Sequence, residues 1–285
     1  MNISGLSKEA FTKSGNSITR VGLGGEGILR TYNRFAEALT VIEEAAAVGI
    51  TYFDSARAYA GSESYYGKFW LKNSALRANI FQTSKSASRD KKCANNDLAN
   101  TLKVMGLDRL DLWQIHDIRT WEEVERIEGP NGALEAFLNA KETGTATFIG
   151  VTGHHDPKVQ EYCISKWPVD AVLLPINPIE ATLGGFMDSV LPLAQEIGLA
   201  VIGMKVLGSS YYISKDLGIS PERLIRYALS QKITTAIVGC STPQEVQTLA
   251  RMASDFKPIS FEEQSRLIEI LRPYSRNLAF YRGTI

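Results

Sequence analysis

The stretch IFQTSKSASRDKKCANNDLANTLKVMGLDRLDLWQIH, residues 80–116, contains the repeating unit from which the fold follows. It begins with a short apolar run that ends in a lysine, Ile80–Lys85. A helical pattern, Asn95–Met105, then stops at Gly106, a position where glycine commonly ends a helix. A second apolar run, Leu110–His116, ends in a histidine. The stretch therefore predicts two parallel strands joined by a helix.

The same alternation of apolar runs and helical patterns recurs along the whole chain. We expect strands at Arg20–Leu23, Tyr52–Asp54, Ile80–Lys85, Leu110–His116, Phe148–Thr152, Ala171–Leu174, Ala200–Lys205 and Thr235–Val238. We expect helices at Arg34–Val48, Ser62–Leu71, Asn95–Met105, Gly132–Thr143, Pro157–Ser165, Asp188–Ile197, Pro221–Ser230 and Pro243–Ala253. Eight such units are typical of the α/β class with a (β/α)8 TIM barrel. A doubly wound open sheet is the alternative, and it usually contains fewer units.

Residues 1–285 are expected to form one domain, because no linker or block of like charge interrupts the pattern. The first 19 residues are expected to close the floor of the barrel. A further helix, Phe261–Leu271, precedes a tail, and we expect the segment 261–285 to lie over the barrel mouth.

Composition excludes several classes of protein. The chain has 31 Lys and Arg against 31 Asp and Glu, with 44% hydrophobic residues, which is ordinary for a globular protein without a basic surface for nucleic acid or membrane. It contains no apolar run of membrane-spanning length and no signal-peptide pattern at its start. Its three cysteines form no C-x-x-C pair. We therefore expect a cytoplasmic protein that acts on a small molecule, without nucleic-acid or membrane partners.

Gly22, Gly24 and Gly27 spell G-x-G-x-x-G, and Glu43 follows about 20 residues later. This spacing resembles the dinucleotide fingerprint of an open α/β sheet. That fingerprint requires a helix directly after the strand, but the helical pattern begins only at Arg34. We interpret these glycines as a flexible turn at the top of the first strand, where a flat ligand can approach the backbone.

Three successive predicted strands end in an ionisable residue, namely Asp54, Lys85 and His116, and Tyr59 follows in the loop after the first of them. In a barrel the carboxyl ends of the strands face the active site, so these side chains are expected to converge. Lys85 is expected to lower the pKa of the Tyr59 phenol, with Asp54 supporting the buried lysine. Tyr59 then acts as general acid on a carbonyl oxygen, to which His116 donates a hydrogen bond. The set suits proton transfer coupled to a hydride donor.

Several motifs in this order resemble the aldo-keto reductase family. They are Asp54-Ser55-Ala56, Tyr59-Ala60-Gly61-Ser62-Glu63, Ser84-Lys85, Leu110-Asp111-Leu112, Ile115-His116, Gly150-Val151-Thr152 and Met204-Lys205-Val206-Leu207-Gly208. The similarity runs from about Val21 to Leu249. It implies a (β/α)8 barrel that reduces aldehydes or ketones with a nicotinamide cofactor. It also implies a catalytic tetrad of Asp54, Tyr59, Lys85 and His116.

The resemblance also implies a set of cofactor-binding residues. Thr152 matches the hydroxyl that holds the carboxamide, and Asn177 belongs to the sixth-strand motif. Met204, followed by Lys205, stands where many members stack an aromatic ring on the nicotinamide. Leu173 replaces an amide that often contacts the carboxamide, which weakens that contact.

The dinucleotide phosphates are expected after the seventh and eighth strands, where barrels commonly bind phosphate. Candidates are Leu207 and Ser209 after the seventh strand and Gly239, Ser241 and Thr242 after the eighth.

Ser241 and Glu245 stand where family members often place a basic residue for the 2′-phosphate of NADP. NADP(H) is the family's usual cofactor and our expectation, and NAD(H) is the alternative that these two residues favour.

The substrate pocket is expected to use side chains near the mouth. Aromatic candidates are Tyr32, Trp121, Tyr274, Phe280 and Tyr281, and the arginines that could bind an anionic substrate are Arg57, Arg276 and Arg282.

Two rival functions fit parts of the pattern. A barrel metallohydrolase would use His116, Asp117, His154, His155 and Asp156, although the first strand lacks H-x-H. A regulatory barrel would bind the nucleotide with little turnover, and the retained tetrad argues against it.

Overall fold

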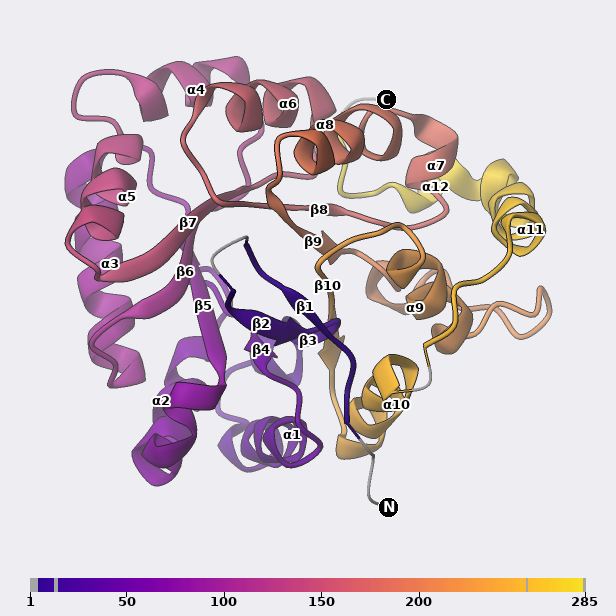
Figure 1. Ribbon diagram of the computed structural model, residues 1–285, viewed down its shortest axis with the longest axis horizontal. Coiled ribbons are helices and arrows are strands. Elements are labelled where there is room, and N and C mark those ends of the chain that lie inside the picture. Colours follow the sequence, from indigo (N-terminus) through magenta and orange to yellow (C-terminus); the bar gives the residue numbers. More distant parts are fainter. Residues whose placement is uncertain (1–4, 13–14, 255, 284–285) are drawn as a thin grey trace.

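The computed structural model describes residues 5–12, 15–254 and 256–283, and it contains a closed barrel of eight parallel strands (Figure 1). The strands are β3 (Val21–Gly27), β4 (Tyr52–Phe53), β5 (Phe81–Ser86), β6 (Leu110–Ile115), β7 (Ala146–Thr152), β8 (Ala171–Pro175), β9 (Ala200–Met204) and β10 (Thr235–Cys240). They pair in sequence order, and β10 pairs with both β9 and β3 to close the ring. The predicted (β/α)8 fold is confirmed, with strand boundaries that shift by a few residues.

Helices surround this barrel (Figure 1). Those expected from the sequence are α1 (Phe35–Ala47), α2 (Ser62–Asn73), α3 (Lys91–Met105), α5 (Ala133–Glu142), α6 (Pro157–Lys166), α8 (Leu191–Glu196), α9 (Pro221–Leu229), α10 (Pro243–Ser254) and α11 (Phe261–Leu271). The structure adds α4 (Trp121–Glu128), α7 (Glu180–Leu183), α12 (Ser275–Leu278), a π turn at Phe186–Val190, and 3₁₀ turns at Ile28–Arg30 (η1), Ser74–Asn79, Gly208–Ser210 and Arg272–Tyr274. The π turn overlaps the start of the helix expected at Asp188–Ile197, and α8 begins only at Leu191.

The floor of the barrel is closed by an N-terminal hairpin, β1 (Lys8–Ala10) and β2 (Ser17–Thr19). Phe11 and Ile18 are buried in a cluster with interior residues of the barrel. The Phe11 ring lies 4.6 Å from that of Phe81 and 5.1 Å from that of Phe148, measured between centroids. The expectation that the first 19 residues close the floor is thereby confirmed for the described part of this segment.

The glycines of the G-x-G-x-x-G pattern lie inside β3 and not in a turn after it, so the expectation of a flexible turn was wrong. A side chain at Gly24 would place its Cβ 2.8 Å from the backbone nitrogen of Gly239. At Gly27, where φ is +69°, a Cβ would lie 2.6 Å from the Cys240 carbonyl oxygen. These glycines let β3 approach β10 closely enough to complete the barrel, and no dinucleotide-type strand-to-helix turn exists there.

The C-terminal tail is attached to the loop after β8. Tyr281 Oη donates to Glu180 Oε1 at 2.7 Å and accepts from Asn177 Nδ2 at 3.1 Å. Arg282 forms an ion pair with the same buried Glu180. This part of the tail therefore lies beside the carboxyl end of the barrel, and the single-domain organisation of residues 1–285 stays a prediction.

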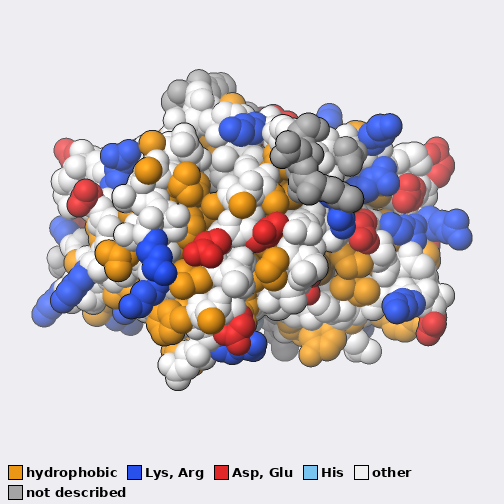
Figure 2. Space-filling view, turned by 90° about the horizontal axis from the view of Figure 1, so that it is seen from below, with side chains coloured by type: hydrophobic (Ala, Val, Ile, Leu, Met, Phe, Trp, Pro, Cys, Tyr) orange, Lys and Arg blue, Asp and Glu red, His pale blue; other side chains and the backbone are white. Residues whose placement is uncertain are grey.

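The surface carries a mixture of charges. On the face shown in Figure 2, basic and acidic side chains are interspersed with scattered hydrophobic ones. No helix within the described ranges combines the length and the hydropathy that a bilayer crossing requires.

Candidate active site

A cleft of about 1080 Å³ opens at the carboxyl ends of the barrel strands. Residues predicted from the sequence that line it are Asp54, Tyr59, His116, Thr152, Met204, Lys205, Leu207, Ser209, Gly239, Ser241 and Glu245. The cleft therefore brings together most of the predicted set. Lys85, Asn177 and Thr242 are not in its lining, and each has a different position described below.

Lys85 lies beneath the cleft as half of a fully buried ion pair. Its Nζ is 2.7 Å from both carboxylate oxygens of Asp54 and 2.8 Å from the carbonyl oxygen of Ser55. Thr83 Oγ1 also donates to Asp54, at 3.1 Å. Burial lowers the pKa of Lys85, and the Asp54 carboxylate opposes that shift. Because each charge has close polar partners, the pair can remain ionised in the interior.

The Tyr59 ring is partly buried at the edge of the cleft. Lys85 Nζ lies 4.8 Å from the ring centroid, and the His116 ring meets it edge-on at 5.5 Å between centroids. A Cβ at Gly25 would lie 2.6 Å from Tyr59 Cδ2, so the absence of a side chain there makes room for the ring. A hydrogen bond of 2.9 Å from Tyr59 N to the Ala56 carbonyl oxygen tightens the loop that carries it.

The pKa of Tyr59 is raised well above its ordinary value, contrary to the expectation from the sequence. Burial is the main cause, and the negative charges of Asp54 and Glu26 act in the same direction. Lys85 does not reverse the shift, because its ammonium donates to Asp54 and Ser55. The phenol is therefore neutral at physiological pH and retains the proton that a general acid must donate.

His116 follows β6 and is a neutral imidazole. Burial, together with the positive charge of Lys85, lowers its pKa to about 3. Its backbone is fixed on both sides, since its N–H donates to Ser86 and its carbonyl accepts from Arg89 Nη1 at 2.9 Å. No protein group in the described part of the chain pairs with its ring nitrogens, so they are available to an oxygen in the cleft.

A buried carboxylate, Glu63 in α2, holds the loop between Asp54 and Tyr59. It accepts from Ser84 Oγ and Thr101 Oγ1 at 2.7 Å each, and from Arg57 Nη1 at 2.9 Å. Arg57 was a candidate for substrate binding, but the structure turns it away from the cleft toward Glu63. Its position ties the loop that carries Tyr59 to β5 and α3.

The residues expected to contact a nicotinamide divide into two groups. Thr152 and Met204 line the cleft, and Thr152 Oγ1 accepts from Asp117 N at 2.8 Å, while its own O–H has no acceptor among the described residues. Asn177 instead uses its side chain within the protein: Oδ1 accepts from the backbone N–H of Glu180, and Nδ2 donates to the Lys205 carbonyl. The structure thus gives Asn177 the role of holding two loops.

The outer end of the cleft is formed by the N-terminal part of α10. Thr242 Oγ1 accepts from Glu245 N at 3.3 Å and caps this helix. Glu245 Oε2 accepts from Ser241 N at 2.6 Å. Gln244, Thr248 and Leu249 complete this part of the lining, so within the described residues this end of the cleft contains an acidic side chain and no Lys or Arg.

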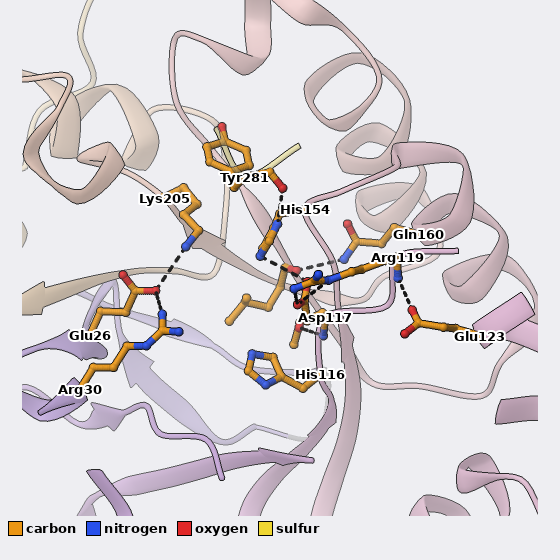
Figure 3. Close-up of polar contacts among 12 residues, drawn as sticks. Glu26, Arg30, His116, Asp117, Arg119, Glu123, His154, Gln160, Lys205 and Tyr281 are labelled. Carbon is orange, nitrogen blue, oxygen red and sulfur yellow. Dashed lines mark hydrogen bonds and ion pairs between the residues drawn. The ribbon is translucent and has the colours of Figure 1, made fainter. Parts of the chain in front are cut away.

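Two residues at the end of the first barrel strand were not predicted from the sequence: Glu26, which lies inside β3, and Arg30, in the turn η1 that follows it. Glu26 Oε1 accepts from Lys205 Nζ at 3.2 Å and from Arg30 Nη1 at 3.1 Å, and Figure 3 shows Glu26 lying between the two cations. Burial opposes ionisation of Glu26, but Lys205 and Arg30 together hold its pKa below the usual value. Their charge at the carboxyl end of the first strand is a signal in the sequence, because that end of each barrel strand faces the active site.

His154 and Asp117 form a second polar group in the cleft lining (Figure 3). His154 Nε2 lies 3.3 Å from Asp117 Oδ1, and Nδ1 lies 2.9 Å from the Tyr281 carbonyl oxygen. Both ring nitrogens thus face protein oxygens. Across the residues that the structure describes, no three His, Cys, Asp or Glu side chains are arranged to hold a metal ion.

The aromatic residues proposed as pocket walls are not part of the cleft lining. Tyr32, Trp121, Tyr274 and Phe280 are exposed, and the Tyr281 side chain is buried against Glu180 and Asn177. The cleft lining instead contains charged side chains, including Arg30, Arg89, Asp117 and Arg119.

Comparisons with known proteins agree with this geometry. The sequence model of the aldo/keto reductase family matches residues 20–217, more than half of the chain. The aldo-keto reductase str7 of Strobilurus tenacellus is 25% identical over 205 residues, which cover 67% of this chain and 59% of that protein. This chain therefore spans about three fifths of the length of that relative.

Solved structures share the fold. The holo form of the aldo-keto reductase AKR11C1 from Bacillus halodurans superposes with a TM-score of 0.78 at 18% identity, covering 93% of this chain and 96% of the other. An aldo-keto reductase from Klebsiella pneumoniae in complex with NADPH gives a TM-score of 0.77 at 17% identity, covering 94% and 96%.

Proposed function

The chain belongs to the aldo/keto reductase family, and from that membership we propose that it is an oxidoreductase that transfers hydride between a nicotinamide dinucleotide and the carbonyl carbon of an aldehyde or ketone. The observation that carries the proposal is the placement of Tyr59 between the buried Lys85 and the neutral His116, at the edge of an open cleft. The proposed catalytic residues are Asp54, Tyr59, Lys85 and His116.

The residues divide the work of carbonyl reduction. His116 donates a hydrogen bond to the carbonyl oxygen and orients it. A nicotinamide held in the cleft would supply the hydride for the carbonyl carbon. As the electron pair of the C=O bond moves to oxygen, Tyr59 transfers its phenolic proton to that oxygen, and the product is the alcohol. The phenolate left behind belongs to a ring whose centroid is 4.8 Å from the ammonium of Lys85, which Asp54 keeps charged and in place.

The lining of the cleft fits a dinucleotide. Its volume of about 1080 Å³ suits a large ligand, and Met204, Ile237 and Val238 supply apolar surface. Lys205 and the N-terminus of the 12-residue helix α10 offer positive charge and N–H groups for phosphates. We propose Thr152, Met204, Lys205, Leu207, Ser209, Gly239, Ser241 and Glu245 as the residues that hold it, with Thr242 acting through the cap of α10.

NADP(H) is the proposed cofactor, with only a small preference over NAD(H). The related K. pneumoniae structure contains NADPH, which supports NADP(H). In this chain, however, Glu245 occupies the outer end of the cleft, where a 2′-phosphate calls for Arg or Lys. An acidic side chain there accommodates a ribose hydroxyl better than a phosphate.

A matrix of NADPH and NADH against aldehydes, ketones and the corresponding alcohols tests the proposal. Turnover is followed by the loss or gain of nicotinamide absorbance. We expect reduction of at least one carbonyl class with both cofactors. Tight cofactor binding without turnover across the matrix would instead assign the chain to the regulatory, nucleotide-sensing type of barrel.

A further inference from the structure

Arg30 ends the 3₁₀ turn η1 after β3 and lies directly over the proposed proton donor. Its guanidinium carbon is 5.2 Å from the centroid of the Tyr59 ring, and it lines the same cleft. The side chain is 51% exposed, so solvent and a small ligand can reach it. A molecule that presents its carbonyl to Tyr59 therefore lies beside this cation.

The positive charge at this point is only partly neutralised. Glu26 shares one carboxylate with two cations, Arg30 and Lys205, so the three side chains together carry one net positive charge. Figure 3 shows both contacts converging on Glu26. Arg30 uses Nη1 for this contact, and within the described residues its Nε and Nη2 have no acceptor. A planar fork of donors remains open to the cleft.

The other arginines of the lining are already engaged. Arg89 donates to the His116 and Asp117 carbonyl oxygens and to Glu123. Arg119 donates twice to the Asp117 carboxylate. Of the three arginines taken from the sequence, Arg57 is bound by Glu63 and Arg282 by Glu180, whereas Arg276 is exposed on α12 outside the cleft lining. Arg30 is thus the lining arginine with free donors next to Tyr59.

We propose that Arg30 is a specificity residue that binds an anionic group of the substrate, and that the enzyme prefers short carbonyl compounds carrying a carboxylate or phosphate within a few carbons of the carbonyl. 2-Oxo acids, semialdehyde acids and phosphorylated aldehydes belong to this class. The guanidinium fork matches the oxygen geometry of both groups. The inference rests on the proposed reductase function and adds the chemistry of its substrate.

Glu26 acts in this scheme as the competing anion. Its contact with Arg30 is between partly exposed side chains, and such ion pairs contribute little, so a substrate anion can take its place. Removing the Glu26 charge should then strengthen the binding of anionic substrates. This gives an experiment in which the proposal predicts a gain as well as a loss.

The test compares kcat/KM for matched substrates that differ only in the anion: glyoxylate with its methyl ester, succinic semialdehyde with butanal, and glyceraldehyde 3-phosphate with glyceraldehyde. We expect the wild type to favour the anionic member of at least one pair by tenfold or more. Arg30→Met should reduce that ratio at least tenfold, and Arg30→Lys should give an intermediate ratio. Glu26→Gln should raise it through a lower KM for the anionic member.

Arg34→Met is the matched control, because Arg34 is an equally exposed arginine that pairs with Glu37 outside the cleft lining. Its ratio should equal that of the wild type. The pair that responds identifies the anion as carboxylate or phosphate. Equal kcat/KM within all three pairs, or a ratio that Arg30→Met leaves unchanged, overturns the assignment. In that case, turnover of the neutral substrates by the wild type would still support the reductase function. If the wild type turns over none of the six substrates, the reductase function itself is rejected.

Discussion

The Lys85 ammonium donates to both carboxylate oxygens of Asp54 at 2.7 Å, and the two residues come from neighbouring strand ends of the barrel. Neither side chain is exposed by more than 1%. This pair lies under the cleft and fixes the backbone at Ser55, next to the loop that carries Tyr59. It therefore links the stability of the barrel to the proposed chemistry.

Breaking this pair from one side should destabilise the fold. Asp54→Asn leaves a buried ammonium without its counter-charge, and we expect a loss of about 3–5 kcal/mol in the free energy of unfolding. Urea unfolding measures it. The double variant Asp54→Asn/Lys85→Met should recover part of the loss but no carbonyl reduction. The exposed pair of Lys91 and Glu135 provides the control, since Lys91→Met should cost less than about 1 kcal/mol.

Replacing the phenol should separate chemistry from cofactor binding. Tyr59→Phe keeps the ring that packs against Gly25 and His116 but removes the proton. We expect kcat to fall by about 10²-fold or more, in the range that general acids contribute. The affinity for NADPH, followed by quenching of protein fluorescence, should stay within about twofold. Turnover close to that of the wild type is incompatible with the role assigned to Tyr59.

The pKa of His116 makes a prediction for stability. Its pKa is about 3 in the folded chain against an ordinary 6.5, so between these values the unfolded chain binds a proton that the folded chain does not. Stability should therefore rise with pH across that window and be lost as pH falls from about 6.5 toward 3, by up to about 1.4 kcal/mol per unit.

The variant His116→Gln isolates this contribution. The pKa of His154 is also lowered, and its effect has the same sign, but it is present in both proteins and cancels. Unfolding free energies at several pH values should show a shallower acid dependence for the variant. Parallel curves for the two proteins would show that His116 protonates as easily in the folded chain as in the unfolded one.

Charge reversal at the outer end of the cleft should change cofactor preference. Glu245→Arg replaces the acidic side chain that holds Ser241 N with a cation suited to a 2′-phosphate. We expect the ratio of kcat/KM for NADPH over NADH to rise at least tenfold. Glu262→Arg, the same charge change on α11 outside the cleft lining, should leave the ratio unaltered. If the ratio in Glu245→Arg equals that of the wild type, the adenosine ribose does not lie beside residue 245.

The sequence was sufficient for the barrel because the alternation of short strand patterns and helical patterns repeats eight times. It also placed Asp54, Lys85 and His116 at strand ends and Tyr59 in the loop after Asp54, since these positions follow from the pattern alone, and their catalytic roles stay a prediction. It misjudged the pKa of Tyr59, because that depends on burial and on which group takes the lysine's charge. It missed α4 and the π turn, where local propensity yields to packing. The partners of Glu63 and Asn177 were equally out of reach, because they lie on distant segments.

The close approach of Gly24 and Gly239 has a consequence for synthesis of the protein. The first barrel strand leaves the ribosome long before the last one has been translated, so its open edge has no permanent partner until residues 235–240 emerge. Nascent chains shorter than this cannot seal the ring. If the ribosome pauses upstream of that point, the nascent chain should be an aggregation-prone intermediate with an unpaired strand edge. Such an intermediate is a substrate for chaperones that act during translation.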